Sequence, residues 1–88
     1  MAVRFRVSTG EEGEARAFSD PILTLICERA FPPGRPITMT LYTDRGQLAL
    51  QAKTIGSRRE IEQRYEVRVR MINLRRMERD LLQTLFLV

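Results

Sequence analysis

Apolar and polar residues alternate along most of this 88-residue chain. In residues 3–8 (VRFRVS), the side chains of Val3, Phe5 and Val7 fall on one face and the polar ones on the other. The same alternation recurs in five further segments, at residues 15–18, 22–28, 37–43, 47–55 and 64–71. A period of two is typical of a β-strand with one buried face, so the pattern predicts six short strands. Segment 22–28 is apolar on both faces and should be the best-buried strand.

The stretches between these segments carry turn and loop signals. The proline-rich FPPGRP at residues 31–36 excludes a helix or a central strand and predicts a rigid loop. The DRG sequence at residues 44–46 predicts a hairpin turn, with Gly46 in the left-handed conformation. GSRREIEQ at residues 56–63 predicts a charged loop, and FSDPI at residues 18–22 predicts a short break between two strands.

The period changes near the C-terminus. Leu74, Met77, Leu81 and Leu85 recur at helical spacing and are joined on the same stripe by Leu82 and Phe86. This pattern predicts one amphipathic helix near residues 74–86. Asn73 is suited to be its N-cap, because a short polar side chain can bond the free N–H groups of the first turn.

Six short strands followed by one helix favour a single domain over residues 1–88, mainly β, built as a six-stranded antiparallel β-barrel capped by the C-terminal α-helix. In the second strand, Ala15 and Ala17 should share one face and Arg16 and Phe18 the other. Nine residues are expected in the core: Leu25, Ile37, Met39, Leu41, Leu50, Val67, Val69, Met77 and Leu81.

Composition narrows the possible functions. The chain has no histidine and a single cysteine, Cys27, so the commonest general base and metal ligand are missing and a Cys–His nucleophile is excluded. We therefore expect no enzymatic activity, no metal and no cofactor. No apolar run approaches the roughly 18 residues of a membrane span, and residues 1–10 lack a signal-peptide core. A cytoplasmic protein without a membrane span is the expectation.

The charge balance is basic. The net charge is +4, and fourteen of the fifteen basic residues are arginines. Two explanations stay open: a base composition of the genome that favours arginine codons, or an anionic partner such as a nucleotide, a nucleic acid or an acidic protein face.

The order of these segments resembles the PilZ domain family. The resemblance covers nearly the whole chain and is carried by FPPG before an alternating strand, by RYEVRVRMINL, and by the following RRMERDLLQTLF. It implies a small six-stranded barrel with a C-terminal helix that serves bacterial signalling as a cyclic di-GMP receptor or as a regulatory adaptor. The implied partner is another protein of a bacterial signalling or motility system.

The two ligand motifs of that family are incomplete here. In its D/N-x-S-x-x-G turn motif, Ser19 matches the serine, but Ala17 and Ile22 stand where the acid or amide and the glycine belong. In its R-x-x-x-R motif, Arg4 and Arg6 are two residues apart instead of four. The resemblance therefore implies a degenerate site, whose candidate residues are Arg4, Arg6, Arg16, Ser19 and Asp20. Tight cyclic di-GMP binding is not expected.

A second group of cations follows in the last strand and the helix: Arg68, Arg70, Arg75, Arg76 and Arg79. Arginines near a helix N-terminus oppose its dipole, so their placement suggests a use, such as binding an acidic partner. The leading hypothesis is an adaptor that acts through protein–protein contacts. The alternatives are a cyclic di-GMP receptor with an altered binding mode and a basic small barrel that binds nucleic acid. Few aromatic residues fall on outward faces for base stacking, so we do not expect nucleic acid as the partner.

Overall fold

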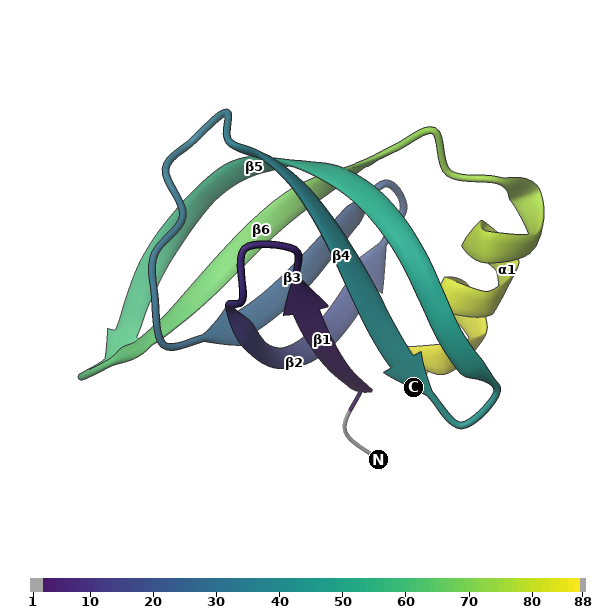
Figure 1. Ribbon diagram of the computed structural model, residues 1–88, viewed down its shortest axis with the longest axis horizontal. Helices are drawn as coiled ribbons and strands as arrows, with labels where there is room; N and C mark the ends of the chain where they lie inside the picture. Colours follow the sequence, from purple (N-terminus) through teal and green to yellow (C-terminus); the bar gives the residue numbers. More distant parts are fainter. Residues whose placement is uncertain (1–2, 88) are drawn as a thin grey trace.

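The computed structural model, which describes residues 3–87, confirms the fold class: a closed six-stranded antiparallel β-barrel followed by one α-helix (Figure 1). The elements are β1 Val3–Val7, β2 Glu12–Ser19, β3 Ile22–Cys27, β4 Pro36–Thr43, β5 Gly46–Ile61, β6 Arg64–Ile72 and α1 Arg76–Leu85. None of the helical structure in residues 3–87 is long and apolar enough to cross a membrane.

The strands follow one another around the barrel in the order β1-β2-β3-β6-β5-β4, and β1 pairs with β4 to close it. Four neighbouring pairs are hairpins between consecutive strands, whereas β3–β6 and β1–β4 join strands that are far apart in the chain. The turn at residues 44–46 has the predicted geometry, because Gly46 has a φ of +113°.

The charged segment at residues 56–63 is not a loop, contrary to the prediction. Most of it is strand, because β5 runs on to Ile61 and pairs with β6 as far as Arg64. Irregularities in the register near residues 55 and 60 let this long strand bend with the barrel. β5 thereby extends beyond the eight residues of β4, and its tip with β6 projects from the body of the barrel (Figure 1).

Alternating side chains of all six strands fill the core. Of the nine predicted core residues, seven are buried: Leu25, Ile37, Met39, Leu41, Leu50, Val67 and Val69. The alternation predicted in the second strand is wrong beyond Ala15, because the register shifts between Ala15 and Ala17. Ala17 is consequently exposed, while Phe18 turns inward and packs against the core.

The helix begins two residues later than predicted, and only part of the predicted apolar stripe packs on the barrel. Asn73 is not the N-cap, since it adopts a φ of +54° before the helix; Arg75 is the cap residue, and its backbone N–H donates to Glu78 Oε1 at 2.9 Å. Met77 was expected in the core but is 83% exposed, and Leu81 is only half-buried. Leu82 is the fully buried residue of α1.

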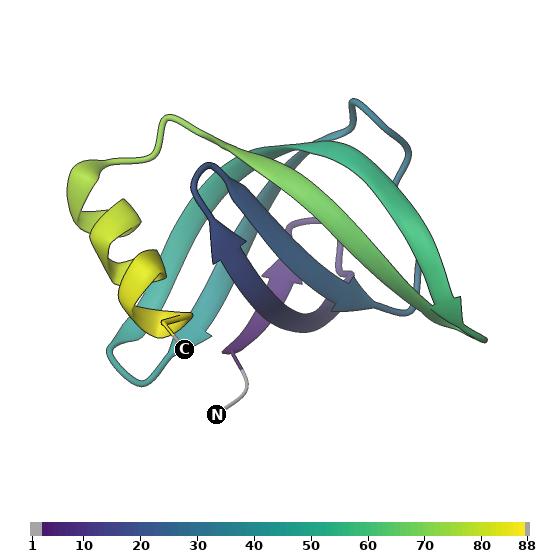
Figure 2. The ribbon, with the colours of Figure 1, turned by 180° about the vertical axis from the view of Figure 1, so that it is seen from behind.

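The helix closes one end of the barrel (Figure 2). Leu74 and Phe86 flank Leu82 against the core, and the β2–β3 turn is tied to α1 by an ion pair between Asp20 Oδ2 and Arg79 Nε at 2.9 Å. This arrangement matches the predicted cap, although through a different residue of the helix.

The proline-rich loop between β3 and β4 closes the opposite end. Its Phe31 is 1% exposed, and its backbone N–H and C=O bond to Ser57 Oγ at 2.8 and 2.9 Å. The guanidinium of Arg35 lies 4.8 Å from the centre of the Phe31 ring and bonds Glu11 Oε2 at 2.8 Å. This end is therefore closed by a single aromatic side chain under an ion pair.

Candidate functional site

The arginines of β1 are held by a carboxylate on the neighbouring strand. Arg4 and Arg6 lie on the outer face of β1, and both approach Glu12, at 4.0 and 3.6 Å. Their side chains are 70% and 59% exposed, so these are weak surface pairs. They nevertheless turn the two guanidinium groups toward a carboxylate of β2.

Arg16 is bound more firmly. It stands at the irregular point of β2, and its guanidinium bonds both carboxylate oxygens of Glu60 at 2.7 and 3.2 Å. This hydrogen bonding raises the pKa of Arg16 and lowers that of Glu60. Arg16 Nη1 also lies 3.6 Å from Glu66 Oε2. Because Glu60 belongs to β5 and Glu66 to β6, Arg16 links β2 to both strands across the outside of β3.

Ser19 is the last residue of β2 and Asp20 lies in the β2–β3 turn, so the break predicted at FSDPI exists but is confined to Asp20 and Pro21. Ser19 pairs with Ile22, and the Asp20–Pro21 peptide bond is cis. The Asp20 carboxylate is engaged by Arg79 of α1. The four charged residues of the predicted ligand site therefore point to three different places: Arg4 and Arg6 to Glu12, Arg16 to β5 and β6, and Asp20 to the helix.

The predicted basic cluster is divided in two. Arg68 and Arg70 are exposed on the outer face of β6, whereas Arg75 and Arg76 are exposed at the start of α1. Arg79 is half-buried and paired with Asp20. Arg79 thus contributes to the attachment of the helix.

The structure adds a residue to Arg68 and Arg70 that sequence reasoning missed. Lys53 of β5 lies directly opposite Arg70 in the β5–β6 pairing. We call Lys53, Arg68 and Arg70 the basic strip. Within residues 3–87, none of the three has an ion-pair partner. The alternation of segment 47–55 already indicated that Lys53 faces outward, but only the strand register shows that it adjoins Arg70.

Isoleucines surround the basic strip. Ile22 of β3 is the other neighbour of Arg70, and Ile55 and Ile72 are 39% and 37% exposed on β5 and β6. A groove of about 270 Å³ runs beside Arg68; it is lined by Ile55, Gly56 and Ser57 and also by the paired side chains of Arg58 and Glu66. Cations and apolar side chains therefore share one outer face of the sheet.

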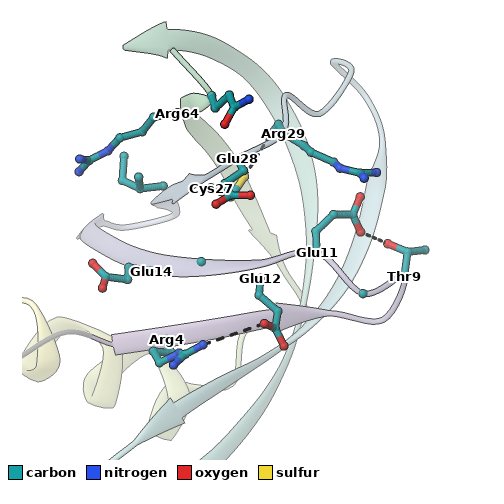
Figure 3. A pocket seen from close by; sticks show the side chains of 13 residues that line it. Arg4, Thr9, Glu11, Glu12, Glu14, Cys27, Glu28, Arg29 and Arg64 are labelled. Carbon is teal, nitrogen blue, oxygen red and sulfur yellow. Dashed lines mark hydrogen bonds and ion pairs between the residues drawn. The ribbon is translucent and has the colours of Figure 1, made fainter. Parts of the chain in front are cut away.

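A hollow of about 850 Å³ lies near the loop-closed end (Figure 3). Carboxylates of Glu12, Glu14 and Glu28 and guanidinium groups of Arg29 and Arg64 stand around it and point in different directions (Figure 3). Four glutamates and three arginines line it, so its charges nearly balance.

Two further side chains that line this hollow, Glu11 and Cys27, form hydrogen bonds within the chain. Glu11 accepts hydrogen bonds from Arg35 and Thr9, which lower its pKa to about 2. Burial raises the pKa of the Cys27 thiol, and Cys27 Sγ donates to the Arg29 carbonyl at 3.0 Å. No group of three or more His, Cys, Asp or Glu side chains is placed to hold a metal ion among the described residues.

Comparisons with protein-family models, with curated proteins and with solved structures each gave no significant match to this chain. The structure defines a small closed barrel with a helix at one end, and the PilZ resemblance stays a prediction from the motifs.

Proposed function

We propose that this chain is a non-catalytic adaptor of PilZ type that acts through protein–protein contacts in the cytoplasm of a bacterium. Six antiparallel strands and a C-terminal helix are what the resemblance implies, and the observed barrel is compatible with it. The proposed partner is another protein of a signalling or motility system, and the cyclic di-GMP site is degenerate.

One observation carries the proposal: the charged groups at the predicted nucleotide site are already neutralised within the chain. Arg16 is bound to Glu60, and Asp20 is bound to Arg79. A nucleotide would have to break these pairs before it gained a charge-assisted contact from Arg16 or Asp20, each worth roughly 1.5–3 kcal/mol. By contrast, a partner can bind the cations of the basic strip without first breaking an ion pair within the described part of the chain.

Titration calorimetry with cyclic di-GMP tests the degenerate site. We expect no saturable heat, because a site lacking two charge-assisted contacts loses about two to four powers of ten in affinity. The variant that restores the family residues, Ala17→Asp with Ile22→Gly, should stay weak because Arg4 and Arg6 keep their shortened spacing. A saturable complex of the wild-type chain with a dissociation constant near or below a micromolar would contradict the proposal and favour the receptor alternative.

The basic strip also keeps a nucleic-acid-binding barrel as a second candidate, because unpaired cations attract phosphates. Its neighbours are isoleucines, however, whereas surfaces that bind single strands offer aromatic rings for stacking. Tyr42, the aromatic residue among the exposed large hydrophobic side chains of residues 3–87, lies on β4 opposite Gln47, six positions along β5 from Lys53. A protein partner therefore fits this face better.

A further inference from the structure

We propose that the basic strip and its isoleucines form a docking surface for an acidic amphipathic helix of another protein. The inference rests on the proposed function, since it names the partner of the same adaptor. It also moves the partner surface away from the helix start, where the sequence placed Arg75 and Arg76, to the outer face of β3, β6 and β5.

The distribution of charge on this face is uneven. Arg58 and Glu66 lie opposite each other in one row of paired residues across the sheet, and Arg58 Nη2 is 3.4 Å from Glu66 Oε2. Glu66 also pairs with Arg16, so these residues form an ion-pair network. The next two rows contain the basic strip: Arg68 lies between Thr24 and Gly56, and Arg70 lies between Ile22 and Lys53. These two rows hold no acid, whereas the row before them contains the carboxylate of Glu66, so unpaired positive charge begins beyond the ion-pair network. A surface of one sign attracts a partner of the opposite sign.

The backbone limits how a partner can bind here. β6 is paired with β3 along one edge and with β5 along the other throughout the basic strip. A partner strand thus has no free edge to join, and recognition must come from side chains. Opposed residues of antiparallel strands lie about 5 Å apart and alternate residues of one strand about 7 Å apart. Side chains at positions i and i+4 of a helix are separated by about 6 Å, which suits both spacings.

The isoleucines decide the chemistry of the partner. Ile22, Ile55 and Ile72 border the cations. An apolar side chain of the partner can contact Ile55 in the groove beside Arg68, where the acid of the lining, Glu66, is already paired with Arg58. Protein interfaces combine buried apolar anchors with arginine in this way. A phosphate backbone brings no apolar side chains, so the partner that satisfies the whole surface carries carboxylates and aliphatic residues on one face.

The test uses a synthetic helical peptide with glutamate and leucine on the same face, titrated onto the full chain by fluorescence anisotropy. We expect saturable binding that the variant with Arg68→Glu and Arg70→Glu weakens roughly tenfold or more, because both attractions become repulsions. Ile55→Ser should weaken it several-fold. A peptide with glutamine in place of glutamate should bind far less well, and raising the salt to about 1 M, where the Debye length is near 3 Å, should reduce binding.

The matched control is the variant with Arg75→Glu and Arg76→Glu, which changes the net charge equally at the start of α1 and should leave peptide binding unchanged. An equal loss in both variants would overturn the docking surface, and so would binding that ignores Arg68 and Arg70 or no binding of the peptide at all. Stronger, strip-dependent binding of oligothymidylate would replace it with a nucleic-acid surface. Cyclic di-GMP titration is a separate readout, so failure of the adaptor proposal is distinguishable from failure of this surface.

Discussion

The two ends of the barrel are closed by different means. At one end, a whole helix covers the core, yet Leu82 is its fully buried residue and its ion pair, Asp20–Arg79, is solvent-exposed. At the other end, a short proline-rich loop inserts Phe31, fixes it through Ser57, and covers it with the better-shielded pair Arg35–Glu11. A short loop can therefore close an end of the barrel, as a helix does at the other, because its one large aromatic side chain is almost completely buried.

Removing Phe31 should give the largest loss of stability. Phe31→Ala deletes a 1%-exposed ring and the stacking of Arg35 on it, for a cost of about 3–5 kcal/mol. Denaturant unfolding followed by circular dichroism measures the change. A loss below about 1 kcal/mol would show that the loop lies over the barrel without sealing it.

Removing Leu82 at the helical end should cost about 2–5 kcal/mol, because its side chain is fully buried. Met77→Ala is the matched control on the same helix, since Met77 is 83% exposed and should change stability little. If the two substitutions had equal effects in the same unfolding experiment, the helix would not pack on the barrel through Leu82.

The ion pair at the loop end should make stability depend on pH. The folded pKa of Glu11 is about 2, against an ordinary value of 4.5, mainly because Arg35 and then Thr9 hydrogen-bond the carboxylate. A lowered pKa contributes stability that is fully present above pH 4.5 and is lost as the pH falls toward 2. Allowing for solvent screening, we expect a loss of roughly 1–2 kcal/mol across this window.

The variant Glu11→Gln measures that contribution, because it cannot be charged at any pH. Its unfolding free energy should be lower than that of the wild type near pH 7 and should converge with it near pH 2. Curves that stay parallel over the whole window would mean that the pair with Arg35 does not stabilise the folded state.

The exposed pair at the helical end should have the smallest effect. Asp20 and Arg79 have side chains that are 32% and 41% exposed, so Asp20→Asn should cost less than about 1 kcal/mol. A double-mutant cycle with Arg79→Gln gives the coupling between them, to be compared with the same cycle on Glu11 and Arg35. A larger coupling at the helical end would reverse the comparison of the two ends.

Local patterns predict the strands well where apolar residues alternate. The period of two correctly predicts β1, β3 and β4 and the inward-facing residues of β6. In these strands the side chains alternate regularly between the two faces, so the local sequence is enough. The second half of β5 was missed because its residues are polar and charged, and strand structure there comes from pairing with β6. Arg16 reaches Glu60 across 44 positions of the chain, so no local pattern could show that this pair exists.

The helix shows a different limit of prediction. The stripe of Leu74, Met77, Leu81 and Leu85 is helical in spacing, but the face that packs is set by how the chain leaves β6. Asn73 adopts a left-handed conformation before the helix, which begins at Arg76, and of the predicted stripe Leu82 is buried whereas Met77 is exposed. The basic strip likewise depends on the register that sets Lys53 opposite Arg70.

The order of strands around the barrel divides it into two three-stranded meanders, β1–β3 and β4–β6, joined along two seams. Each meander can form from contacts between neighbours in the chain, whereas the seams β3–β6 and β1–β4 bring together distant residues, such as Leu25 opposite Val67 and Phe5 opposite Leu41. Non-local pairing has to overcome the entropy of closing long loops before it contributes any stability, which slows folding. We therefore expect the rate at which this chain folds to depend on the closing of the two seams, in the millisecond-to-second range typical of barrels.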